Sequence, residues 1–109
     1  MTPAIAYVTT ASEAEALAIG RAVVEARLAA SVNVLPGATS FYWWEGAVQE
    51  SAEAVLILKT RDDLVDALVD KVTSMHSYEC PCIVSWPITK GYRPYIEWVL
   101  GETKAVSQP

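Results

Sequence analysis

Apolar positions in the N-terminal part of the chain change from a continuous run to a helical spacing. Residues 4–8, AIAYV, form a short apolar run that predicts a buried strand. Ser12 and Glu15 follow in the spacing of a capping box, which opens a helix. The apolar stripe of this helix consists of Leu17, Gly20, Val24 and Leu28. The pattern predicts an amphipathic helix over about residues 12–29.

The next segment, residues 31–60, is rich in β-branched and aromatic residues, which predicts two extended stretches. Glu45 and Gly46 separate the two stretches and predict a hairpin turn. Pro36-Gly37 interrupts the first stretch and indicates a bulge or bend. Residues 54–59, AVLILK, are apolar on both faces, so this stretch is expected in the centre of a sheet.

A second helix is predicted after residue 60. Thr60 and Asp63 have the spacing of another capping pattern. Its apolar stripe consists of Leu64, Leu68, Val72 and Met75. The helix is expected to end near His76.

The last third of the chain predicts one strand and one short helix. Residues 82–88 read as a strand that is closed by Pro87. Pro94 fits the first turn of a helix over about 93–100, with Gly101 as its C-terminal stop.

The predicted order is β-α-β-β-α-β followed by a short helix, which is the ferredoxin-like α+β arrangement. Two helices cover one face of an antiparallel sheet, and nothing in the sequence covers the other face. The strands nevertheless carry several aromatic residues: Phe41, Tyr42, Trp43, Trp44 and Trp86. An uncovered aromatic face predicts a subunit interface. Residues 1–109 are expected to form a single domain, with 1–3 and 104–109 as frayed tails.

Composition and charge exclude several classes of protein. The net charge of -5 and the eight scattered Lys and Arg residues argue against a nucleic-acid partner. The N-terminus lacks the basic and apolar regions of a signal peptide, and no apolar run approaches the ~20 residues of a membrane span. A cytoplasmic protein without a membrane partner is therefore expected. The chain is 52% hydrophobic over only 109 residues, which again predicts that another subunit covers part of it.

Candidate chemistry is concentrated in residues 75–88, MHSYECPCIVSWPI. His76, Glu79, Cys80 and Cys82 are residue types that bind soft and borderline metals. Each also has a structural interpretation. His76 suits the negative end of a helix dipole, Glu79 could form an ion pair between subunits, and cysteines often pack as small hydrophobes.

Four segments of the chain resemble successive motifs of a known family. They are RLAASVNVLPGATSFYWWEGAVQE, AVLILKTR, MHSYECP and WPITKGYRPYIEWV, and the match extends over roughly residues 4 to 103. The chain is similar to the CutA family of divalent-cation tolerance proteins. The resemblance implies a ferredoxin-like fold in a compact homotrimer, similar in architecture to the PII signalling proteins. It also implies a response to metal ions, copper binding in some members, and no established catalytic reaction.

Only some of the family's copper-binding positions hold a copper-binding residue type in this chain. Some bacterial members bind copper through one cysteine and two successive histidines, and these positions hold Thr9, Met75 and His76 here. Ser31 stands where many members have a cysteine, and Cys82 where a carboxylate is common. We expect no obligatory cofactor and weak Cu(II) binding centred on His76. The other candidate metal ligands are Met75, Glu79, Cys80 and Cys82.

Residues 75–82 are expected to form one wall of a cleft between subunits. The candidate cleft and interface residues are Asn33, Trp43, Trp44, Lys59, Tyr78 and Trp86. Asn33 could bind a ligand or satisfy backbone groups at the Pro36-Gly37 bend. The tryptophans are expected to pack.

Three alternatives to metal tolerance stay open. A PII-like sensor would hold a small anion or nucleotide through Lys59, Arg61 and Lys90. A structural trimer would organise a protein partner. An acylphosphatase-like enzyme shares the architecture but needs an arginine in the loop after the first strand, and TTASEAE contains no Arg and no Gly.

Overall fold

Strand β1 (Pro3–Thr10) lies in the middle of a four-stranded antiparallel sheet of order β2-β3-β1-β4. The computed structural model describes residues 1–104. The other elements, in chain order, are α1 (Glu13–Glu25), β2 (Ser31–Trp44), β3 (Ala47–Arg61), the 3-10 turn η1 (Asp62–Leu64), α2 (Val65–Met75), β4 (Ile83–Pro87) and α3 (Arg93–Glu102). This is the predicted α+β, ferredoxin-like order. AVLILK lies within β3, between β1 and β2, as predicted.

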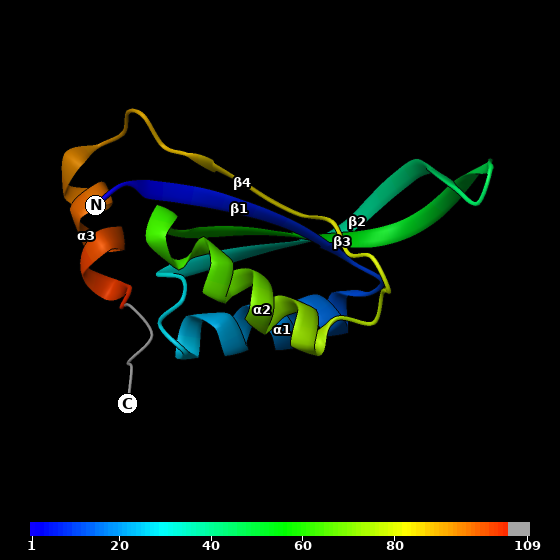
Figure 1. The fold of residues 1–109 in the computed structure, drawn as a ribbon, viewed down its shortest axis with the longest axis horizontal. Coiled ribbons are helices and arrows are strands. Elements are labelled where there is room, and N and C mark those ends of the chain that lie inside the picture. The colour runs from blue at the N-terminus through cyan, green and yellow to red at the C-terminus, as the bar shows by residue number, and fades with distance from the viewer. Residues whose placement is uncertain (105–109) are drawn as a thin grey trace.

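Helices α1 and α2 cover one face of the sheet, and α3 lies at one end of it (Figure 1). The core between helices and sheet is formed by fully buried aliphatic side chains. It includes Ala6, Val8, Ile19, Val23, Leu56, Leu58, Leu68 and Val72. Gly20 of α1 allows the helix to approach closely, because a Cβ there would lie 3.1 Å from side-chain atoms of Leu56 and Val32. In the part of the chain that is described, no helix has the length and hydropathy that crossing a bilayer requires.

The β2–β3 hairpin extends beyond the rest of the sheet (Figure 1). Its turn lies at Glu45 and Gly46, as predicted, and both residues have positive φ, 52° and 79°. The register shifts between Leu35 and Ala38, which confirms the bulge predicted at Pro36-Gly37. Gly37 has a φ of 81°, a conformation that glycine adopts without steric cost.

The sheet face opposite α1 and α2 is uncovered within one chain and carries large apolar side chains. Val84, Trp86 and Trp44 are 52%, 47% and 44% exposed on this open face. Trp43, on the other side of the hairpin, is 75% exposed. The tryptophans that we expected to pack therefore do not pack within the chain, and their place in a subunit interface stays a prediction.

Helix α1 begins at the predicted cap but ends four residues before the predicted end. The side chain of Ser12 accepts a hydrogen bond from the Glu15 amide at 3.1 Å, which confirms the cap. The helix ends at Glu25 because Arg27 adopts a left-handed conformation with φ 64°. Leu28 still reaches the core from outside the helix, whereas Leu17 is 54% exposed. The residues of α1 that are buried are Ala16, Ile19, Gly20 and Val23.

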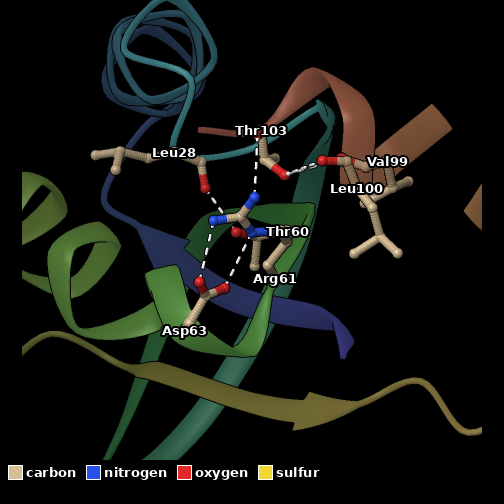
Figure 2. Close-up of polar contacts among 7 residues, drawn as sticks. All are labelled: Leu28, Thr60, Arg61, Asp63, Val99, Leu100 and Thr103. Carbon is tan, nitrogen blue, oxygen red and sulfur yellow. Dashed lines mark hydrogen bonds and ion pairs between the residues drawn. The ribbon is translucent and has the colours of Figure 1, made fainter. Parts of the chain in front are cut away.

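The capping pattern predicted at Thr60 is wrong. Thr60 belongs to β3, and its hydroxyl donates to the carbonyl oxygen of Leu28 at 2.6 Å (Figure 2). A 3-10 turn precedes α2, and neither helix start has a side-chain cap. Met75, expected as the last core position of α2, is 37% exposed.

The C-terminal helix also differs from the prediction. Gly101 lies inside α3, and Thr103 follows its last residue. The Thr103 hydroxyl donates to the carbonyl oxygen of Val99 at 2.9 Å (Figure 2). At the predicted tails, β1 already begins at Pro3, and the amide of Lys104 donates to the Arg27 carbonyl at 3.0 Å. Residues 105–109 of the predicted tail lie outside the described residues.

Candidate functional site

The connection between α2 and β4, residues 76–82, lies against the open sheet face at the base of the hairpin. Together with strands β1, β2 and β3 it encloses a groove of about 740 Å³. The groove is lined by Tyr7, Thr9, Ser40, Tyr42, Trp44, Glu53, Ser77, Tyr78, Glu79, Cys80, Pro81 and Cys82. We call this the hairpin groove.

The ring of His76 uses both of its nitrogen atoms in hydrogen bonds. Its Nδ1 lies 3.0 Å from the backbone nitrogen of Tyr78, which can only donate. Nδ1 is therefore the acceptor, and Nε2 carries the proton that it donates to the carbonyl oxygen of Thr9 at 2.7 Å. This arrangement needs a neutral ring, so it opposes the interpretation of His76 as a charged residue at the helix end. A metal ion could reach a nitrogen lone pair only by displacing the Tyr78 amide.

Glu15 connects the start of α1 to the 76–82 connection. One carboxylate oxygen accepts from the Ala11 amide at 3.0 Å and the other from the Ser77 amide at 2.7 Å. Burial raises the pKa of Glu15, but the hydrogen bonds from Ser77 and Ala11 outweigh this effect, so the pKa is lowered. A carboxylate thus occupies the loop where an acylphosphatase would bind a phosphate.

Glu53 and Tyr78 form a polar pair in the wall of the hairpin groove. The Tyr78 hydroxyl donates to Oε2 of Glu53 at 2.9 Å, and Glu53 is only 8% exposed. Burial, together with this hydrogen bond and the charge of Glu53, raises the pKa of Tyr78 to about 12. Tyr78 therefore stays a hydrogen-bond donor at neutral pH.

Both cysteines are free and exposed, and both line the hairpin groove. They do not pack within the chain, so that interpretation is wrong for the isolated subunit. Burial and the charge of Glu53 raise the pKa of Cys82, and a hydrogen bond with Thr9 only partly opposes this. A raised pKa leaves less thiolate at neutral pH, and the thiolate is the metal-binding form.

The structure brings together only some of the predicted site residues. Trp44, Tyr78, Glu79, Cys80 and Cys82 share the hairpin groove. Its lining does not include the remaining predicted residues, Asn33, Trp43, Lys59, Met75, His76 and Trp86. Between residues 1 and 104, no three or more His, Cys, Asp or Glu side chains gather where they could hold a metal ion.

Two of the three basic residues that were predicted to hold an anion, Lys59 and Arg61, form contacts within the chain. Lys59 donates from Nζ to Oδ1 of Asn33, so Asn33 bonds to a side chain and not to backbone groups at the bend. Arg61 is only 7% exposed and forms two 3.0 Å contacts with Asp63, as Figure 2 shows. Lys90 is exposed. Arg61 therefore cannot serve as an open anion site.

Sequence reasoning missed three residues of the groove lining: Tyr7, Ser40 and Glu53. Glu53 lies two, four and six positions before Val55, Ile57 and Lys59 in β3, so all four side chains point to the same face of the sheet. This spacing could have placed Glu53 on the open face. Its partner Tyr78 lies 25 residues away in the sequence, and no local pattern predicts that contact.

Comparison with known proteins identifies the family. The sequence profile described as "CutA1 divalent ion tolerance protein" matches residues 4–102. The chain belongs to the CutA1 family. This confirms the resemblance that the motifs indicated.

Relatives and solved structures agree with this assignment. Human protein CutA is 45% identical over 102 residues, which cover 94% of this chain and 57% of the human protein. The divalent-cation tolerance protein CutA of Thermus thermophilus is 41% identical over 99 residues, covering 91% of this chain and 96% of that protein. The chain thus spans just over half of the human relative and nearly all of the bacterial one. The structure of CutA1 from Oryza sativa matches with a TM-score of 0.94 at 38% identity, covering 97% of both chains.

Proposed function

We propose that this chain is a non-catalytic divalent-cation tolerance protein that assembles as a homotrimer and binds Cu(II) weakly. Membership of the CutA1 family supports the general role. The observation that carries the metal proposal is the placement of one imidazole, two thiols and the Glu79 carboxylate within a single connection, residues 76–82. Copper ranks highest among the divalent first-row metals for such ligands.

Weak binding follows from the contacts of these groups. Copper at His76 must displace the hydrogen bond from the Tyr78 amide, whose loss opposes binding. The raised pKa of Cys82 makes its thiolate less available. Binding should also fade as pH falls, because protons compete with the metal for imidazole and thiolate.

The trimer proposal rests on the open sheet face. Large apolar side chains at 44–52% exposure are costly to leave in water, and together they form the kind of patch that obligate interfaces cover. Sedimentation equilibrium should give three times the chain mass of 11.8 kDa. A stable monomer at micromolar concentration would contradict the proposal.

Titration calorimetry of the purified protein with Cu(II) and Zn(II) tests the metal site. We expect weak Cu(II) binding that His76→Ala largely removes while the assembly stays intact. The matched variant carries Cys80→Ser and Cys82→Ser and should retain most of the binding. A tight stoichiometric site that survives His76→Ala and disappears with the two serine substitutions would overturn the assignment to His76.

A small-ligand sensor is the second candidate, and the volume of the hairpin groove favours it. About 740 Å³ lies in the range of small-molecule sites, roughly 300–1,000 Å³. The acylphosphatase-like alternative is disfavoured by Glu15, whose carboxylate accepts hydrogen bonds from the amides of Ala11 and Ser77. The cytoplasmic location expected from the sequence stays a prediction.

A further inference from the structure

Two loops of the same chain meet at the hairpin end of the sheet and are joined by hydrogen bonds. One loop connects β1 to α1, and the other is the 76–82 connection (Figure 1). The Ser77 amide donates to Oε2 of Glu15 at 2.7 Å. Both partners belong to one chain, and Glu15 is on α1, which covers the sheet face opposite the open face. Assembly through the open face therefore leaves this bond in place.

The carboxylate of Glu15 is used differently from that of an ordinary capping box. In a capping box, the glutamate at the third helical position bonds back to the amide of the N-cap residue. Here the Ser12 side chain accepts from the Glu15 amide as usual. The Glu15 carboxylate, however, accepts from the amides of Ala11 and Ser77. The start of α1 thus holds a peptide group 62 positions further along the chain.

Ser77 lies between His76 and the amide that blocks the His76 ring. Nε2 carries the proton donated to the Thr9 carbonyl, so a metal ion can bind only at Nδ1, after the Tyr78 amide has moved away. The position of the Tyr78 amide depends on the two backbone dihedral angles of Ser77, because the peptide bonds on either side are rigid. Glu15 fixes the Ser77 amide and so restricts the rotation that would release Nδ1.

We propose that Glu15 is a positioning residue for His76, and that its bond to the Ser77 amide keeps the imidazole unavailable to a metal ion. This role rests on the copper site proposed at His76 and deepens that proposal, because it names what limits the affinity. Only molecules in which Nδ1 is released bind the metal, and the apparent dissociation constant rises as their fraction falls. Loss of the bond should raise this fraction about threefold to tenfold, the range expected for one hydrogen bond.

Two substitutions remove this bond and keep the negative charge of residue 15, which itself attracts a metal ion. Ser77→Pro removes the donor. The backbone of His76, with φ -82° and ψ 142°, already has the extended conformation that a residue before proline needs. Glu15→Asp shortens the side chain by one methylene group, so its carboxylate no longer spans the Ala11 and Ser77 amides. Ser77→Ala keeps the amide and is the matched control.

Calorimetric titration with Cu(II) tests the role of Glu15. The dissociation constant should be about threefold to tenfold lower for Ser77→Pro and for Glu15→Asp than for the parent, while urea unfolding shows lower stability in both. A merely structural role would lower the stability without tightening the metal. The variant that combines both substitutions should bind no more tightly than either one, because both remove the same bond. Ser77→Ala should stay close to the parent.

A metal-free measurement separates this role from the copper proposal. Diethyl pyrocarbonate acylates a ring nitrogen of histidine whose lone pair is free. His76 is the chain's single histidine, so the ultraviolet absorbance of the acylated ring reports on it alone. The acylation rate should rise about threefold to tenfold in Ser77→Pro and in Glu15→Asp, and it should not change in Ser77→Ala.

The two measurements distinguish the possible failures. Unchanged acylation in both Ser77→Pro and Glu15→Asp would overturn the role of Glu15, and so would equal or weaker copper binding in both variants of a protein that binds copper at His76. Faster acylation without any copper binding would support the role of Glu15 and contradict the copper proposal. If Ser77→Pro does not fold, the result for Glu15→Asp decides.

Discussion

The hydroxyl of Tyr78 donates to Glu53 at 2.9 Å and ties the connection after α2 to the middle of β3. The contact joins residues 25 positions apart, and both of them line the hairpin groove. It also gives a mostly buried carboxylate its hydrogen-bond donor. The shape of the groove therefore depends on a pair that neither residue's local sequence specifies.

Tyr78→Phe should destabilise the protein by about 1–3 kcal/mol, the usual cost of leaving a buried polar group without its partner. Urea unfolding at pH 7 measures the change. In the background of Glu53→Gln the same substitution should cost less, because a neutral amide loses less than a buried carboxylate. Equal costs in both backgrounds would show that the two side chains are not coupled.

The same pair predicts a loss of stability at alkaline pH. The pKa of Tyr78 is raised to about 12 from an ordinary value of 10.0, so the folded state holds the phenol proton more tightly than the unfolded state. Its contribution is complete below pH 10 and disappears as pH rises through about 12. Urea midpoints of the parent and Tyr78→Phe should therefore converge between pH 10 and pH 12. A constant difference across this range would exclude the shift.

The hydrogen bonds of Glu15 predict a loss of folding stability at acid pH. Its pKa is lowered from 4.5, so its contribution is present above that value and lost as pH falls through the folded-state pKa. Glu15→Gln should cost about 1 kcal/mol at neutral pH, since it weakens charge-assisted bonds from the Ala11 and Ser77 amides. The parent and the variant should approach each other in stability at pH 3. Glu13→Gln, an exposed neighbour on α1, is the control and should change little.

Arg61 should contribute far more to the stability of the fold than a surface arginine does. It is 7% exposed, forms a two-bond ion pair with Asp63 and donates to the Thr103 carbonyl at 3.4 Å. Arg61→Met should cost about 2 kcal/mol in thermal or urea unfolding, in the range for hydrogen bonds to charged groups. Arg21→Met removes the exposed pair with Glu25 and should change stability by less than about 0.5 kcal/mol. Similar costs for both would contradict the role assigned to Arg61.

Two tryptophans of nearly equal exposure test the subunit interface. Trp86, on the open sheet face, is 47% exposed, and Trp98, on α3, is 45% exposed. If the open face is the interface, Trp86→Ala should shift the sedimentation equilibrium toward smaller species, whereas Trp98→Ala should not. An unchanged assembly in Trp86→Ala would place the interface elsewhere.

Patterns that act within a few residues predicted the fold well. The Ser12 cap, the turn at Glu45 and Gly46, and the bulge at Pro36-Gly37 each depend on neighbouring backbone groups, and all are present. Thr60 failed as a cap because a tertiary contact to Leu28 takes its hydroxyl. Gly101 failed as a stop because α3 continues to Glu102, where the Thr103 hydroxyl bonds back to the helix.

The candidate site was less predictable, for a physical reason. The ligand types in residues 75–82 were visible in the sequence, but their availability depends on long-range partners. His76 is engaged by Thr9, 67 positions away, and the groove charge comes from Glu53 on another strand. Residue type predicts what a side chain can bind, while the fold decides which of its atoms stay free.

The central position of β1 has a consequence for the order in which the chain folds during synthesis. β1 is synthesised before both of its neighbours in the sheet. Helix α1 and strand β2 separate it from β3, and α2 comes between β3 and β4. Until residues 83–87 leave the ribosome, one hydrogen-bonding edge of β1 has no strand beside it. Unpaired apolar edges are where incomplete chains associate. Nascent chains that stall before β4 should therefore be the species most prone to aggregate and most dependent on chaperones.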